Sequence, residues 1–261
     1  MSRPPQIHHG ITVSDLDDIE WRLRELGFTN FQPNAVEPLW FHDRDGDPVG
    51  QMTACVLGAG YRTHYIENPA TGQQICLIEV VPEARLPHPG GGRLETDLTI
   101  TIPVADPARG VELLAGREVQ DLRFVPIDAE DPWALAYYSP EGWVASRPFF
   151  EEVLGVEIET IGPDRYRFVA IGGRLEVQVD PAVPRLVPGM GKRYQGANHF
   201  RLLGIDLDLA AERLVADPAC SFLLPPANGF AFAWGPSGEA VELFDRSVSD
   251  DEIAPKETAH A

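Results

Sequence analysis

Hydrophobic and polar positions alternate in short runs along the first eighty residues. Residues 7–13 alternate as a half-buried strand does, and Asp15 and Asp17 follow where the start of a helix favours acids. The next apolar positions are spaced for one helical face, and Gly27 ends that pattern. The chain therefore opens with a strand and a capped helix. Further alternating runs predict strands at residues 38–41, 50–57, 61–66 and 74–81.

The same pattern begins again after a segment rich in proline and glycine, residues 82–96, which is typical of a linker. A strand at 98–105 precedes an acid-capped helix at 108–114. Three further strands are predicted at residues 122–125, 134–138 and 143–146. A third, incomplete copy runs from a short helix at 148–155 to a strand at 174–180, and its opening strand is missing or shared. A second segment rich in proline and glycine, 181–196, precedes the last copy.

The copies share a fixed spacing, which identifies an internal repeat. His8 precedes Asp15 by seven residues, and His199 precedes Asp206 by seven. In the second copy the same offset from Asp106 falls on Thr99. The ends of the copies also share one frame, in which the corresponding last-strand positions are Cys76, Ser146 and Glu242.

Composition narrows the class of protein. The chain has 261 residues, of which 44% are hydrophobic, enough for one large or two small domains with a sizeable core. A net charge of −19 would repel phosphate backbones, so nucleic acid and anionic membranes are not expected as partners. No apolar run suits a signal peptide or a membrane span, which predicts a cytoplasmic location. Three cysteines without a CxxC pair make a disulfide framework improbable.

Three stretches together resemble the vicinal oxygen chelate superfamily, also called the glyoxalase, bleomycin-resistance and dioxygenase group. They are residues 8–17, residues 149–155, and Gly235-Pro236-Ser237-Gly238 leading into residues 241–243. The resemblance covers roughly residues 5–245. It implies an α+β fold built from repeated βαβββ modules, whose curled mixed sheets enclose a cavity. It also implies that the first module faces the fourth, as in some single-chain members.

Repeat and resemblance together predict four modules with their connections. These are module 1 at 5–82, a linker at 83–96, module 2 at 97–147, a degenerate module 3 at 148–181, a linker at 182–196, module 4 at 197–245, and a flexible tail at 246–261.

The resemblance also implies a metal site, because family members take ligands from the first and last strands of two facing modules. Here those positions hold His8, His199 and Glu242. Two imidazoles and one carboxylate suit a divalent ion such as iron, manganese or zinc, with positions left open for substrate. His9 alternates to the opposite strand face from His8 and is expected not to bind the metal.

The fourth ligand of glyoxalase-like members falls on Cys76, a departure from the family pattern. Either the site has three protein ligands, or the Cys76 thiolate coordinates, or Glu79 reaches in after a change of register. In the middle modules, Thr99 and Ser146 supply no comparable site, and Glu176 has no histidine opposite. One metal per chain follows from this pattern.

Arg62, His64 and Tyr65 on the strand before Cys76 are candidate catalytic residues, as an anion clamp or general acid–base groups. The alternative is that they form the polar surface of an antiparallel sheet. Ring-cleaving dioxygenases carry a tyrosine in the module that donates the glutamate, but the equivalent position here is Phe232. This departure weakens the case for extradiol cleavage.

The resulting hypothesis is a divalent-metal-dependent lyase or isomerase of the glyoxalase type. Its substrate would be a small oxygenated metabolite that chelates the metal through adjacent oxygens. An extradiol Fe(II) dioxygenase and a metal-free ligand-binding or resistance protein are the alternatives. A small-molecule substrate is the expected partner, and a homodimer is compatible with the sequence.

Overall fold

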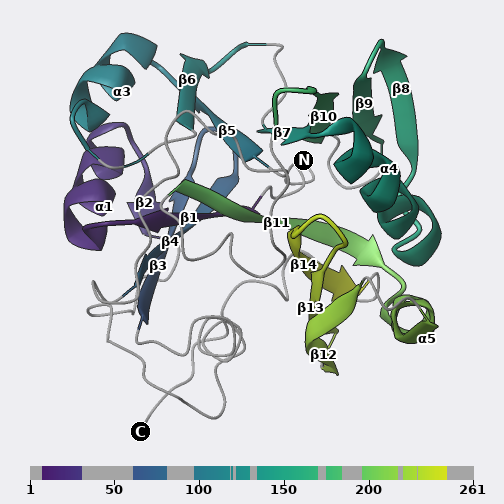
Figure 1. Ribbon diagram of the computed structural model, residues 1–261. Helices are drawn as coiled ribbons and strands as arrows, with labels where there is room; N and C mark the ends of the chain where they lie inside the picture. Colours follow the sequence, from purple (N-terminus) through teal and green to yellow (C-terminus); the bar gives the residue numbers. More distant parts are fainter. Residues whose placement is uncertain are drawn as a thin grey trace, which may run out of the picture.

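The computed structural model contains two mixed β-sheets with helices packed against them (Figure 1). It describes residues 8–30, 61–80, 97–117, 119, 122–129, 134–169, 175–183, 196–216, 220–227 and 229–245. The predicted strands at 38–41 and 50–57, most of both linkers, and the tail lie outside these residues. The predicted α+β class is confirmed, and the two sheets remain open rather than closing into a barrel.

The larger sheet has eight strands in the order β12-β13-β14-β11-β1-β4-β3-β2. One half comes from the start of the chain: β1 (His8–Val13), β2 (Thr29–Asn30), β3 (Tyr61–Asn68) and β4 (Gln73–Val80). The other half comes from its end: β11 (Gly196–Ile205), β12 (Ser221–Ala227), β13 (Phe230–Trp234) and β14 (Ala240–Asp245). Strands β1 and β11 pair antiparallel and join the two halves. The first module therefore meets the fourth, as the resemblance implied.

The smaller sheet has six strands in the order β6-β5-β7-β10-β9-β8. Its members are β5 (Asp97–Val104), β6 (Leu122–Pro126), β7 (Ala134–Tyr138), β8 (Ile158–Gly162), β9 (Arg165–Phe168) and β10 (Leu175–Val179). Strands β5 and β7 pair antiparallel at its centre, which corresponds to the β1–β11 junction of the larger sheet.

Each copy of the repeat has a helix, and a short polar side chain caps each one. The helices are α1 (Leu16–Glu25), α3 (Pro107–Leu114), α4 (Pro140–Pro148) and α5 (Leu207–Ala216). The caps are Asp15, Asp106, Ser139 and Asp206, each accepting a hydrogen bond of 3.0–3.1 Å from the amide three residues on. Such a cap contributes about 1 kcal/mol. The spacing of acids in the sequence therefore located three of the four helices correctly.

The middle of the chain is divided differently from the prediction. Residues 143–146 were expected to form a strand, but they lie within α4, which continues into a π-helical turn at Phe149–Val153. Ser139 caps this helix, so Ala134–Tyr138 stands in the place of the first strand of a module. Strand β10 pairs parallel with β7 just as β4 pairs with β1.

The third module is thus β7-α4-β8-β9-β10, and its missing first strand is β7. The second module is the reduced one, because β6 lies parallel to β5 directly after α3. The predicted strand at 143–146 was wrong because Ser139 and Pro140 begin a helix, in whose first turn proline is tolerated.

One hydrophobic cluster joins the helices and one face of each sheet. Phe150 is a fully buried member of this cluster, and its ring centroid lies 4.8 Å from that of Phe168 and 6.2 Å from that of Phe200. A polar side chain at a strand end also connects the two sheets: Asn68, the last residue of β3, donates to the carbonyl of Pro103 at 2.8 Å. The core thus holds the two sheets in a fixed arrangement.

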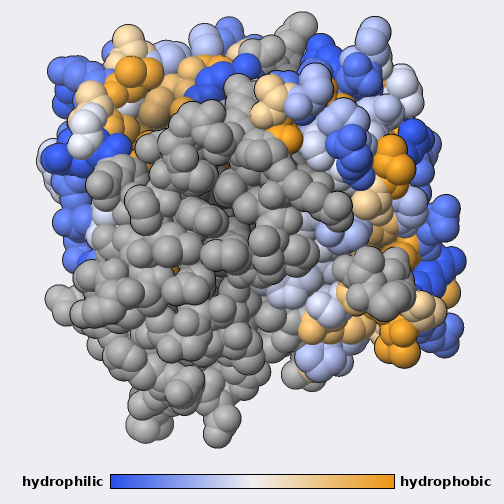
Figure 2. Space-filling model, viewed as in Figure 1, coloured by the Kyte–Doolittle hydropathy of each residue, from blue (hydrophilic) through white to orange (hydrophobic). Residues whose placement is uncertain are grey.

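The outer margin of the described surface is largely polar. Figure 2 shows hydrophilic residues along the edges of the face in view, with smaller hydrophobic groups between them. This distribution agrees with the strongly negative net charge of the chain.

Candidate functional site

Pairing across the large sheet decides which side chains share a face, because directly paired residues point to the same side. Gly10 pairs with His199 and with Cys76, and Cys76 pairs with Tyr65. Arg201, two residues after His199, pairs with Glu242. These residues therefore share one face, while Ile11, Ile75, Phe200 and Val241 occupy the opposite face and enter the hydrophobic core.

His199 and Glu242 lie close together on this first face. The Nε2 atom of His199 is 4.0 Å from Oε1 of Glu242, and the two side chains are 1% and 2% exposed. The ring of Phe232 packs edge-on against His199 with centroids 5.6 Å apart. A carboxylate and an imidazole are thus held together in a nearly water-free environment, where electrostatic interactions are strong.

Gly10 makes room for the His199 ring. A Cβ atom built on Gly10 would lie 1.8 Å from Cε1 of His199, so any larger residue would displace the imidazole. Gly10 stands in the predicted motif beside His8, and its lack of a side chain allows the ring to lie over the β1 backbone. No signal in the sequence connected Gly10 with His199.

Arg201 is a member of this site that sequence reasoning did not identify. Its Nε atom donates to Oε2 of Glu242 at 3.0 Å, and its Nη1 atom donates to Gln74 at 3.3 Å. The guanidinium lies 4.7 Å from the ring centroid of Phe244, and the Arg201 side chain is 7% exposed. Gln74 in turn donates to Glu67 at 3.2 Å. The available signal was the offset of two residues from His199, which strand alternation puts on the same face.

The third predicted ligand, His8, is the first residue of β1, and its Cα pairs with that of Gln74. Its side chain lies outside the described part of the structure. Within the described residues, no group of three His, Cys, Asp or Glu side chains is arranged to hold a metal ion. His199 and Glu242 nevertheless fit a divalent ion in chemistry and burial, and their atoms approach from neighbouring parallel strands. They would supply two ligands, and His8 remains the prediction for the third.

His9 lies in the core rather than in the site. It pairs with Phe200 and Ile75, both members of the hydrophobic cluster, and is 2% exposed. Burial, with a smaller contribution from Arg201, lowers the pKa of His9 to about 3. His9 thus lies on the opposite face of the sheet from His199, as alternation along the strand predicted.

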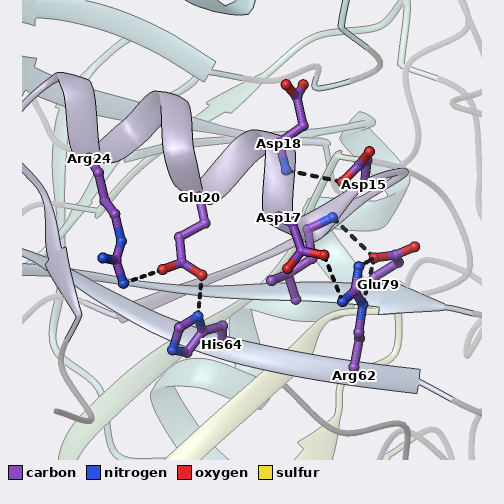
Figure 3. A network of polar contacts seen from close by, with 9 residues as sticks. Asp15, Asp17, Asp18, Glu20, Arg24, Arg62, His64 and Glu79 are labelled. Atoms are coloured by element: carbon purple, nitrogen blue, oxygen red, sulfur yellow. Dashed lines mark hydrogen bonds and ion pairs between the residues drawn. The ribbon is translucent and has the colours of Figure 1, made fainter. Parts of the chain in front are cut away.

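Arg62 and Glu79 do not lie beside His199. Their Cα atoms pair directly, and both side chains face α1 (Figure 3). Arg62 binds Glu79 at 2.6 Å and Asp17 at 2.9 Å, and Glu79 also accepts from the amide of Leu16 at 3.0 Å. Pairing between β3 and β4 runs without a shift, so the register change that would bring Glu79 into the site does not occur.

His64 also faces α1, where its Nδ1 atom contacts Glu20 (Figure 3). Arg24 binds the other carboxylate oxygen of Glu20 at 2.5 Å. Burial acts to raise the pKa of Glu20, but His64 and Arg24 outweigh it and the pKa is lowered. The prediction that Arg62 and His64 line the metal face therefore differs from the structure, because strand alternation puts them on the helix side. On that side, Arg62 and His64 contact acidic residues of α1 and stabilise its packing against the sheet.

Tyr65 alone of the three predicted catalytic residues shares the face of His199. It packs against a small cluster formed by Cys76, Ile78 and Val80. Cys76 is fully buried, and its Cα pairs with Gly10, over which His199 lies. Tyr65, Cys76, Gly10 and His199 thus form one row across four strands.

The positions expected to correspond in the smaller sheet do not assemble a similar site. Thr99 pairs with Leu135, whereas Ser146 lies on α4 and contacts Ser237. Glu176 is held by Arg165 and Arg167, each at 2.7 Å.

Within the described residues, no helix is long and apolar enough to span a membrane. No protein-family model matches the sequence. No curated protein matches it significantly either.

Solved structures show what the fold is similar to. A single-substitution variant of glyoxalase I from Zea mays matches with a TM-score of 0.54 at 14% identity, over 94% of this chain and 95% of that chain. Glyoxalase I from Zea mays itself matches with a TM-score of 0.53 at 13% identity, over 92% of each chain. At such identities the likeness concerns the fold alone. The chain therefore has the fold of glyoxalase I, which agrees with the fold that the sequence resemblance implied.

Proposed function

We propose that this protein is a divalent-metal-dependent enzyme of the glyoxalase type. Its substrate would be a small oxygenated metabolite that presents two neighbouring oxygens to the metal, and the reaction would be a lyase or isomerase step. The main support is the buried His199–Glu242 pair at the junction of the first and fourth modules. The fold places this pair next to the strand that begins with His8.

A bound divalent ion would polarise the adjacent oxygens of the substrate as a Lewis acid. His199 and Glu242 would hold the ion, with His8 as the predicted third ligand. Phe232 and the sheet backbone exclude water from one side of His199. Tyr65 is the proposed proton-transfer group, because it lies on the same face in the row that contains His199.

A metal-free ligand-binding protein is the second candidate, and Arg201 favours it. The guanidinium already pairs with Glu242, so the buried carboxylate is charge-compensated without a metal. A ring-cleaving dioxygenase has less support, since Phe232 pairs with Glu242 at the position where a tyrosine was expected.

Elemental analysis of protein purified without chelator tests the proposal. We expect about one equivalent of transition metal in the wild type and its loss in His199→Ala. His64→Gln is the matched control, because His64 is also buried in the large sheet but faces α1. A wild type that contains no metal and takes up no added Mn(II), Fe(II) or Zn(II) would leave the ligand-binding alternative. Equal metal content in wild type and His199→Ala would exclude His199 as a ligand.

A further inference from the structure

Arg201 is a buried, positively charged residue of the site, and such a residue favours a negatively charged ligand. It lies on β11 between Glu242 on β14 and Gln74 on β4, and the Arg201 side chain is 7% exposed. A buried guanidinium is costly unless its charge and its donors are satisfied. The way in which this group is satisfied therefore bears on what the site binds.

The hydrogen-bond donors of Arg201 are only partly used. A guanidinium carries five N–H donors in a planar fork. In the described part of the chain, one donor goes to Glu242 and one to Gln74, and the Phe244 ring contacts the face of the group. This leaves donors for a planar oxyanion such as a carboxylate, which guanidinium binds in two-point geometry.

The charges of the site favour the same ligand. Without a metal, the negative charge of Glu242 balances the positive charge of Arg201. A second carboxylate, Glu67, is hydrogen-bonded to Gln74, the other partner of Arg201. A divalent ion held by Glu242 and neutral imidazoles would leave the cluster with excess positive charge. A neutral substrate would not remove this excess in a buried site, whereas an anionic substrate would.

We infer that Arg201 binds a carboxylate of the substrate, so that the substrate class is a 2-oxo or 2-hydroxy carboxylate anion rather than a neutral carbonyl compound. The inference rests on the proposed function and narrows it. One carboxylate oxygen and the neighbouring oxygen would chelate the metal ion, and Arg201 would bind the carboxylate from the β11 side. Glu242 stays within reach of both Arg201 and His199.

Oxalate is a suitable probe, because it is a small dianion with vicinal oxygens, and glycolamide is a neutral compound with the same oxygen arrangement. Both are titrated calorimetrically into the wild type, Arg201→Lys and Arg201→Gln, each saturated with Mn(II) and with its metal content measured. Arg62→Gln is the matched control, since it removes another guanidinium–carboxylate pair on the opposite face of the sheet. Circular dichroism establishes that each variant is folded.

We expect Arg201→Gln to bind oxalate about 10- to 100-fold more weakly than the wild type, the range for losing charge-assisted hydrogen bonds. Arg201→Lys keeps the positive charge but lacks the planar fork of donors. Its affinity for oxalate should lie between those of the wild type and Arg201→Gln. Glycolamide binding should change less than about twofold in all variants, and Arg62→Gln should bind oxalate as the wild type does.

Oxalate affinity within about twofold of the wild type in both Arg201 variants would overturn the inference while leaving the metal site intact. An equal loss of oxalate and glycolamide binding would also overturn it, since Arg201 would then act on the metal rather than on the anion. If Arg201→Gln does not fold, Arg201→Lys alone decides by its ratio of oxalate to glycolamide affinity. Failure of the wild type to take up metal refutes the proposed function separately, and this inference with it.

Discussion

Glu239 is a buried carboxyl group, outside the proposed metal site, that we expect to make the stability of the protein depend on pH. It is 2% exposed and lies where the turn before β14 packs against α4 and β7. Oε2 accepts from the amide of Ser237 at 2.9 Å. Burial raises the pKa of Glu239, and hydrogen bonds from Ser146, Tyr138 and backbone amides offset this only in part.

The perturbation is Glu239→Gln, which keeps the shape and the acceptor for Ser237 but cannot ionise. A carboxyl whose folded pKa lies above its unfolded value of 4.5 stabilises the protein at low pH. That contribution is lost as pH rises from the unfolded value toward the folded one. Within this window one proton separates the two states, so the stability of the wild type falls by about 1.4 kcal/mol per pH unit relative to the variant.

Urea unfolding at pH steps upward from about 5 measures this difference. The wild type and Glu239→Gln should differ little at the acid end, and the variant should become progressively more stable as pH increases. Glu141→Gln controls for net charge, because it removes an exposed carboxylate from α4 nearby. Its stability curve should run parallel to that of the wild type. Parallel curves for the wild type and Glu239→Gln would refute the reasoning.

Three further predictions concern the large sheet. Gly10→Ala should displace the His199 ring and lower metal affinity by about tenfold or more, measured by competition with a chelator, whereas unchanged affinity would contradict the close contact. Glu20→Gln should lower the free energy of unfolding at neutral pH by about 1–3 kcal/mol, because His64 and Arg24 lose their carboxylate partner. That loss should shrink as pH falls through the lowered pKa of Glu20, and a constant difference in urea unfolding would argue against it. Tyr65→Phe should retain full metal content but reduce kcat by about 100-fold once a substrate is known, and unchanged kcat would exclude it as the proton-transfer group.

Much of the fold was readable from the sequence, because its signals are local. The caps Asp15, Asp106 and Asp206 mark helix starts wherever they occur, since a short acidic side chain satisfies amide donors that a helix leaves open. The equal spacing of Asp15 from His8, Asp106 from Thr99 and Asp206 from His199 indicated the repeat and, through the family resemblance, the pairing of the first and fourth modules. The helical state of residues 143–146 was missed, because apolar runs of that length fit a strand equally well, whereas the π-helical turn at Phe149–Val153 lies within the short helix predicted at 148–155.

By itself, the sequence determined which residues could act as ligands, and the tertiary structure decided which of them meet. His199 and Glu242 come together through the pairing of β11 with β14, which alternation along each strand anticipates. The partition of Arg62, His64 and Tyr65 between two faces depended on register between β3 and β4, and a shift of one residue would have reversed it. Gly10 beneath His199 depends on the bulged junction of β1 with β11, and Arg201 beside Glu242 depends on the register of β11 with β14. Such contacts join residues far apart in sequence, and their geometry is fixed only when the whole sheet has formed.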